Sequence, residues 1–388
     1  MKRLFILGLV LALLSAHASA AGAKTGKVRI LMSFKGEPDT AVISNAGGNV
    51  LHRYGIIKNR VAVEIPANAL KGILNNPNVE GFEYDALAYA NKATKPCEPW
   101  PSCRDDPEPP EPDPEQELPW GVDRVDADLV AGTGAGVVVC IVDTGIDKDH
   151  PDLEANIIGG RNFVKKRNKL DTNAWDDDAG HGSHVAGTVA AIDNEIGVVG
   201  VAPQASLLGA KVLNSRGVGY ITDIMAGVDY CVAAGADVIS MSLGSGTDVQ
   251  GLHDAVDAAE AAGVVVVASA GNSAGPVVFP AAYSSVIAIS ATDSSDNIAS
   301  FSSFGPEVEL SAPGVNVLST WMNGGYDTKS GTSMSAPHVS GVAALAIQAN
   351  PGLDNDEIRT LLHGTADDLG ALGHDDYFGY GLVDAQLA

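Results

Sequence analysis

Val137-Val138-Val139-Cys140-Ile141-Val142-Asp143-Thr144-Gly145 is an unbroken apolar run that ends in a carboxylate and a turn. Runs that are apolar at every position are typical of strands buried on both faces, as in a parallel sheet. Because functional groups collect at the carboxyl ends of such strands, Asp143 is predicted to lie at a crevice there. An aspartate in this position can also simply cap a turn, so this stretch alone leaves its role open.

The same pattern recurs through residues 115–388, where short apolar runs alternate with helical segments. Such alternation predicts an α/β domain in three layers, a mostly parallel sheet with helices on both faces. The predicted strands are Gly136–Val142, Ser206–Val212, Val238–Leu243, Val264–Ala268 and Val286–Ala291, and the predicted helices include His181–Ala191, Tyr220–Ala234 and Gly251–Ala262.

A smaller unit is predicted over residues 21–90. Its segments follow the order strand, helix, strand, strand, helix, strand, which is a ferredoxin-like α+β pattern. A unit of about 70 residues has only a marginal core. The predicted strands are Lys27–Phe34, Val50–Ile56, Val61–Ile65 and Gly81–Leu87, and the predicted helices are Pro38–Asn45 and Pro66–Asn75.

The chain begins with Met1-Lys2-Arg3, continues with an apolar run from Leu4 to Leu14, and then reads Ala18-Ser19-Ala20. A charged start, a short apolar core and a small-x-small site predict a signal peptide over residues 1–20, cleaved after Ala20. A membrane anchor would need about 20 apolar residues. We therefore expect a secreted, extracellular protein that has no membrane contact once the signal is removed.

Residues 91–114 are rich in proline, aspartate and glutamate, a composition that predicts an extended linker, with a docking tail as the alternative. The formal net charge of −24 argues against a nucleic-acid partner, which would need a basic face. Export permits disulfides. Cys97 and Cys103 are expected to pair locally, whereas Cys140 and Cys231 could either pair or remain small buried hydrophobes.

Two further motifs are each predicted to open a helix: His181-Gly182-Ser183-His184-Val185-Ala186-Gly187-Thr188 and Gly331-Thr332-Ser333-Met334-Ser335-Ala336-Pro337-His338. A serine at a helix start has an exposed hydroxyl beside free backbone N–H groups. Ser333 could alternatively be a helix cap. A metal pair formed by His181 and His184 finds no support in a nearby cysteine or an HExxH pattern.

Together these residues predict nucleophilic catalysis. A serine hydroxyl needs a base, which a histidine held by a buried aspartate supplies. The chain order Asp143, His181, Ser333 is one of the known orders of such triads. The three motifs resemble those of the subtilisin family, and the resemblance covers most of the chain. It implies a serine endopeptidase of broad specificity that forms an acyl-enzyme with protein or peptide substrates, with His184 and Ser335 as bystanders.

The resemblance implies further site residues. Asn272, within Ala268-Ser269-Ala270-Gly271-Asn272, would bind the oxyanion together with the backbone N–H of Ser333. Two edge segments would hold an extended substrate between them by strand addition. The expected cleft residues are Gly217, Val218, Gly219, Ser242, Leu243 and Gly244.

Structural calcium is also implied by the resemblance. Carboxylate, carboxamide and carbonyl oxygens suit Ca²⁺. A second cation could lie near Ala281, Tyr283 and Val286. The cluster Asp176-Asp177-Asp178 could also bind a cation, with a solvated loop as the alternative. The expected ligands of the main site are Gln116, Asp152, Ile192, Asn194, Ile196 and Val198.

The resemblance makes the unit at residues 21–90 a propeptide that assists folding and then inhibits. Its tail Ala86-Leu87-Ala88-Tyr89 would lie in the cleft like a product, with self-cleavage after or close to Tyr89 and a final N-terminus near Asn91 or near Glu115. We expect a monomer. The alternatives are a catalytically silent binding protein of the same fold, and a cofactor enzyme, although the glycine-rich residues 132–136 precede a strand instead of following one.

Overall fold

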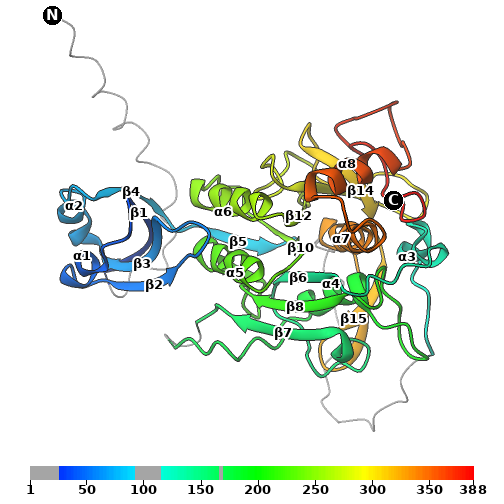
Figure 1. Cartoon of the computed structure of the whole chain (residues 1–388), viewed down its shortest axis with the longest axis horizontal. Coiled ribbons are helices and arrows are strands. Elements are labelled where there is room, and N and C mark those ends of the chain that lie inside the picture. The colour runs from blue at the N-terminus through cyan, green and yellow to red at the C-terminus, as the bar shows by residue number, and fades with distance from the viewer. Residues whose placement is uncertain (1–25, 92–114, 166–168) are drawn as a thin grey trace, which may run out of the picture.

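The computed structural model describes residues 26–91, 115–165 and 169–388 (Figure 1). Figure 1 shows a small N-terminal unit beside a larger domain, with strand β5 (Leu87–Ala90) reaching into the larger domain. The predictions of a signal peptide, of an acidic linker and of a Cys97–Cys103 bond fall on residues outside the described ranges. Within those ranges, no helix is both long and apolar enough to cross a membrane.

The larger domain is built on a seven-stranded sheet in which neighbouring strands run parallel. Apart from the edge strand β7, its strands are buried at almost every position, as the uniformly apolar runs predict. In order across the sheet they are β14 (Val308–Pro313), β13 (Ile287–Thr292), β12 (Val265–Ser269), β10 (Val238–Met241), β6 (Val138–Asp143), β8 (Ser206–Lys211) and β7 (Ile157–Asn162). The α/β prediction is confirmed.

Helices cover both faces of this sheet. The four that pack on it are α4 (His181–Ala190), α5 (Ile221–Ala233), α6 (Gln250–Ala261) and α7 (Thr332–Ala349). Smaller elements complete the domain: α3 (Trp120–Arg124), α8 (Asn355–Thr365), the hairpin of β15 (Val317–Trp321) and β16 (Gly325–Lys329), and single 3₁₀ turns at Ala127–Leu129 and Glu154–Asn156.

Successive residues of a strand point to opposite faces, and this alternation divides the core in two. Cys140 and Val142 of β6 belong to the apolar cluster that includes α5 and α6 residues. Val139 and Ile141 belong to the cluster that includes α4 and α7 residues. In Figure 1, α5 and α6 accordingly lie on the side of the sheet nearer the N-terminal unit, and α4 and α7 on the other.

A disulfide links Cys140 on β6 to Cys231 on α5 across 91 residues of sequence. Both cysteines are fully buried. The bond decides the alternative that the sequence left open for this pair. In the chain-entropy account, closing a loop of this length stabilises the fold by roughly 4–5 kcal/mol relative to the reduced chain.

The N-terminal unit has the predicted order of elements, in an antiparallel sheet ordered β2-β3-β1-β4. Ile30, Met32 and Phe34 face its own core, whereas Leu31 on the opposite face joins the core of the larger domain. The elements are β1 (Lys27–Phe34), α1 (Thr40–Asn45), β2 (Asn49–Arg53), β3 (Arg60–Pro66), a 3₁₀ turn (Ala67–Ala69), α2 (Leu70–Ile73) and β4 (Val79–Tyr84).

One predicted strand is wrong. The range Gly81–Leu87 is not continuous, because β4 ends at Tyr84 and β5 joins a different sheet, in which it lies between β11 (Leu243–Gly244) and β9 (Val218–Tyr220). The break lies at Asp85, whose buried carboxylate binds Arg29 at 2.9 Å and the backbone N–H of Thr222 at 3.1 Å. These contacts tie the break to β1 through Arg29 and to the larger domain through Thr222.

Two histidines of the larger domain are fully buried, His184 on α4 and His338 on α7. His184 Nε2 donates to Val317 O at 3.1 Å, and His338 Nδ1 donates to Met334 O at 2.8 Å. Burial disfavours the imidazolium, which lowers the pKa of His184 to about 3 and that of His338 to about 4.

Because both pKa values lie below the ordinary value, the unfolded chain binds more protons than the folded chain between about pH 6.5 and pH 4. Stability should therefore be full above this window and fall with decreasing pH, by roughly 1 kcal/mol per pH unit for each histidine. Urea denaturation at about pH 7, 6 and 5 measures the slope. His338→Gln should reduce it, and His253→Gln, at a partly exposed position, should not. A flat profile would contradict the assignment.

Candidate active site

Asp143 and His181 form the buried centre of the site. Asp143 is the last residue of β6, and His181 is the first residue of α4. His181 Nδ1 donates to Asp143 Oδ1 at 2.7 Å and lies 2.9 Å from Oδ2. Nε2 then carries the lone pair, and it has no hydrogen-bond partner among the described residues. The imidazole is held by one nitrogen and free to take a proton at the other.

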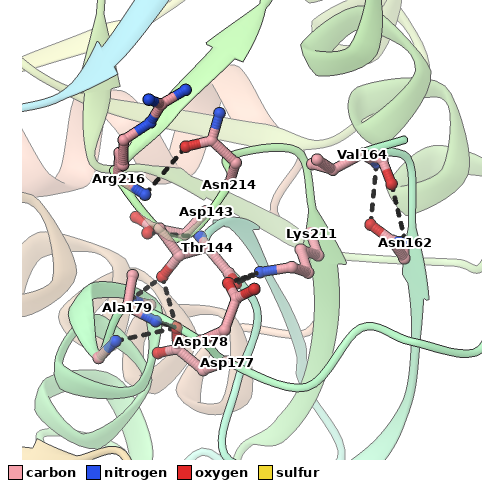
Figure 2. Close-up of polar contacts among 12 residues, drawn as sticks. Asp143, Thr144, Asn162, Val164, Asp177, Asp178, Ala179, Lys211, Asn214 and Arg216 are labelled. Carbon is pink, nitrogen blue, oxygen red and sulfur yellow. Dashed lines mark hydrogen bonds and ion pairs between the residues drawn. The ribbon is translucent and has the colours of Figure 1, made fainter. Parts of the chain in front are cut away.

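Thr144, the residue after Asp143, helps to hold Asp143 and the start of α4 in place (Figure 2). Its backbone N–H donates to Asp143 Oδ1 at 2.7 Å. Its hydroxyl donates to Asp177 Oδ1 at 2.8 Å and accepts the N–H of Gly182 at 2.9 Å. One threonine thereby joins the end of β6 to the start of α4.

Asp177 binds the free backbone groups at the start of α4. Oδ1 accepts the N–H groups of Ala179 at 2.9 Å and Gly180 at 3.0 Å. Oδ2 accepts the N–H of Ser183 at 2.9 Å and its hydroxyl at 2.7 Å. A carboxylate at a helix N-terminus satisfies orphan donors and interacts favourably with the helix dipole. The position of His181 therefore depends on Asp177.

Lys211 is the last residue of β8, and its ammonium is buried. It donates to Asp178 Oδ1 at 2.5 Å and to the carbonyl of Thr144 (Figure 2). The third aspartate of this loop, Asp176, accepts the N–H of Lys148 at 3.4 Å and pairs with the Lys148 ammonium at 3.7 Å. Asp176 also lies near Asp147 and Asp149, with carboxylate oxygens within 4.8 Å of one another, and a cation at this loop stays a prediction.

Ser333 lies in the first turn of α7, facing the tail of the N-terminal unit. Its Oγ lies 2.7 Å from Asn91 O and 3.0 Å from Ser242 O. Asn272 Nδ2 also donates to Asn91 O. The hydroxyl therefore points to the Asn91 carbonyl and Ser242, and no hydrogen bond joins it to His181 among the described contacts. The contact of Asn91 O with the backbone N–H of Ser333 stays a prediction.

The contacts of the Asn272 carboxamide oxygen fix the orientation of its amino group. Asn272 Oδ1 accepts the N–H of Thr332 at 2.9 Å and its hydroxyl at 3.0 Å. Thr332 Oγ1 in turn accepts the N–H of Gly271 at 3.1 Å. With the oxygen bound in this way, the amino group faces Asn91 O. The sequence motif gave no reason to single out Thr332, although it directly precedes Ser333.

The six predicted cleft residues lie along β5. In the register, β5 pairs with β9 (Val218–Tyr220) on one side and with β11 (Leu243–Gly244) on the other, antiparallel to both. At the end of β5, the N–H of Ala90 donates to Gly217 O at 2.9 Å, and the N–H of the next residue, Asn91, donates to Ser242 O at 3.3 Å.

The residue that reaches Ser333 differs from the expected one. The carbonyl beside the hydroxyl is that of Asn91, and Tyr89 lies two residues earlier with its ring 51% exposed. The antiparallel register sets this distance, because Tyr89 pairs with Gly244 and Val218 while Ala88 is fully buried. Sequence alone gives no register for the tail.

The residues predicted to hold calcium also lie together. Asp152 Oδ1 accepts from Asn194 Nδ2 at 2.9 Å, and Oδ2 accepts the N–H of Val198 at 3.0 Å. Gln116 Nε2 donates to Ile192 O at 3.0 Å. Ile196, the remaining member, donates its N–H to Asn194 Oδ1 at 2.7 Å.

Asp152 is buried, and burial raises the pKa of its carboxyl. Among the described residues no lysine or arginine forms an ion pair with it. A buried carboxylate without a cationic side chain, next to the Asn194 carboxamide and the backbone of Val198, is a donor type that suits an oxygen-ligated divalent cation.

Comparison with known proteins agrees with this geometry. The subtilase family pattern matches residues 134–381. Subtilisin NAT of Bacillus subtilis subsp. natto is 37% identical over 402 aligned positions, which span 99% of this chain and 97% of the relative. Subtilisin DY of Bacillus licheniformis is 46% identical over 282 positions, spanning 70% of this chain and 99% of the relative.

A third relative, Subtilisin Savinase of Lederbergia lenta, is 45% identical over 277 positions, which span 70% of this chain and 99% of the relative. The family match covers most of the larger domain, and the alignment with Subtilisin NAT extends through the N-terminal unit as well. The chain belongs to the subtilase family of serine endopeptidases.

Proposed function

We propose that this chain is the precursor of a secreted endopeptidase whose catalytic residues are Asp143, His181 and Ser333, with Asn272 as oxyanion donor. One observation carries the proposal. The Asn91 carbonyl is held by Ser333 Oγ and Asn272 Nδ2, while the nearby imidazole has a free lone pair on Nε2. A catalytically silent binding protein would not need this complete set of groups.

In the proposed reaction, Ser333 Oγ attacks the carbonyl carbon while His181 Nε2 takes the hydroxyl proton. Asp143 keeps the Nδ1 proton in place and stabilises the imidazolium. Asn272 Nδ2 donates to the oxyanion of the tetrahedral intermediate. His181 returns the proton to the leaving amine, which leaves an ester on Ser333, and water hydrolyses that ester with His181 again acting as the base.

Substrates would bind as β5 does, as a third strand between β9 and β11. Most of this recognition uses main-chain groups, which every peptide carries, so protein and peptide substrates of many sequences can enter. The covalent step requires only that the strand continue to a carbonyl at the position of Asn91 O.

The N-terminal unit is proposed to act as intramolecular chaperone and inhibitor. Its Asp85 accepts the N–H of Thr222 in the first turn of α5, and its Arg29 pairs with Asp223 at 2.8 Å. The backbone N–H groups of Gly55 and Ile56 also donate to one carboxylate of α5, that of Asp229. These contacts would order α5 during folding and keep β5 in the cleft.

We further propose that the unit is removed by cleavage of the Asn91–Lys92 bond, and that the mature enzyme is exported as a monomer. Mass spectrometry of the purified product should find an N-terminus at Lys92, or one trimmed further toward Glu115. Ser333→Ala should stay full length. A sulfonyl fluoride should label Ser333 and abolish activity. A mature protein that remains unlabelled and hydrolyses no peptide would overturn the proposal.

The oxyanion donor can be tested separately. Asn272→Leu should lower kcat by about 10²–10³-fold, because one donor to the oxyanion is lost. Thr332→Val should lower kcat by about tenfold with little change in KM, since only the orientation of the carboxamide is released. Ser335→Ala, two residues from the nucleophile, is the matched control and should keep its activity. Equal activity of all three variants would refute the assignment.

For calcium, we propose that Gln116, Asp152 and Asn194, with the backbone carbonyls of Ile192, Ile196 and Val198, hold one structural ion. This ion would neutralise the buried charge of Asp152 and stabilise the loop. The chemistry of catalysis does not involve it.

Ligand bound only to the folded state adds stability by mass action, about 2.7 kcal/mol at a hundredfold excess over Kd. Calcium should therefore raise the melting temperature of the chelator-treated protein. Asp152→Asn should abolish that rise. Asp149→Asn, in the separate acidic group at the surface, should keep it. The reverse result for the two variants would place the ion at the surface group instead.

A further inference from the structure

The side chain of Asn91 enters a pocket at the end of β12. Its Nδ2 donates to Ser269 Oγ at 2.8 Å and lies 3.5 Å from Ser269 O. Ser269 is fully buried. We propose that this pocket selects asparagine on the acyl side of the cleaved bond, with Ser269 and Val278 as the specificity-determining residues. This inference rests on the proposed function and names the substrate class of the same site.

Val278 borders the space around the Asn91 carboxamide. A Cβ placed on Gly244 would lie 2.3 Å from Val278 Cγ2 and 3.0 Å from Asn91 Nδ2, so both groups border the same small space. A Cβ on Gly271 would lie 3.2 Å from each methyl of Val278. The valine therefore fills the gap between the two glycines. On this proposal, the methyl groups of Val278 limit the length of the side chain that the pocket accepts.

The chemistry of the pocket favours a carboxamide. Ser269 O can only accept, so a carboxylate oxygen in the place of Nδ2 would face a carbonyl oxygen, in a protein of net charge −24. An apolar side chain would leave the buried Ser269 hydroxyl without this partner, and unpaired buried groups oppose binding. Asparagine satisfies both the length and the donor requirement, and aspartate only the length.

The preference can be measured with chromogenic peptides Leu-Ala-Tyr-Ala-X, which repeat residues 87–91 with X as Asn, Asp, Ala, Leu or Phe. For the mature enzyme, kcat/KM for Asn should exceed that for each other peptide by about tenfold or more. Ser269→Ala should lower the ratio of Asn to Ala by roughly 3- to 10-fold. Val278→Gly should raise kcat/KM for Leu and Phe by about tenfold or more.

Ser240→Ala, on the neighbouring strand β10, is the matched control for Ser269→Ala. It should leave the order of the five peptides unchanged. An enzyme that cleaves after Leu or Phe better than after Asn, or a Ser269→Ala variant that keeps the full preference, would overturn the inference while leaving the proposed function intact.

A second readout does not require catalysis. In full-length Ser333→Ala, the pocket should protect the N–H groups of Ala90 and Asn91, which bond to Gly217 and Ser242, from hydrogen exchange. Adding Asn91→Asp or Asn91→Leu should speed their exchange by about tenfold relative to Asn91. Equal exchange rates would count against the pocket, even if no peptide were hydrolysed and the proposed function failed.

Discussion

The hydrogen bond from His181 Nδ1 to Asp143 is the contact around which the active site is arranged. It joins the carboxyl end of a central strand to the first residue of a helix, so both partners are as rigid as the sheet. A second layer holds it in place: Thr144 connects the two elements, and Asp177 binds the helix start. The other imidazole nitrogen, Nε2, has no hydrogen-bond partner among the described residues and takes the serine proton in the proposed mechanism.

The tail of the N-terminal unit occupies the part of the candidate site that contains Ser333 and Asn272. It occupies the groove by adding a strand between two others, and it ends with a carbonyl at Ser333 and Asn272. The tail of the N-terminal unit uses main-chain hydrogen bonds that the proposed substrates would also use. Contacts of Asp85 and Arg29 with the start of α5 add an anchor that an ordinary peptide lacks.

Broad and narrow recognition are combined in this groove. Main-chain pairing along β5 does not depend on side chains, whereas the pocket behind the carbonyl is short and offers acceptors. On the inference drawn above, entry to the groove is permissive and cleavage is selective. In this proposal, Val278 limits the length of the substrate side chain and Ser269 binds its carboxamide. Substitutions at the two positions can separate these contributions.

Residue types and spacing predicted the α/β sheet and singled out Asp143, His181 and Ser333, because each depends on a contiguous motif, whereas the candidate residues of the cleft and of the calcium site came from the family resemblance of such motifs. Tertiary structure alone decided the Cys140–Cys231 bond, the break at Asp85, the roles of Thr332 and Asp177, and Asn91 as the residue at Ser333. The reason is physical: strand register and the partners of buried polar groups depend on segments distant in sequence, and a local pattern carries no information about them.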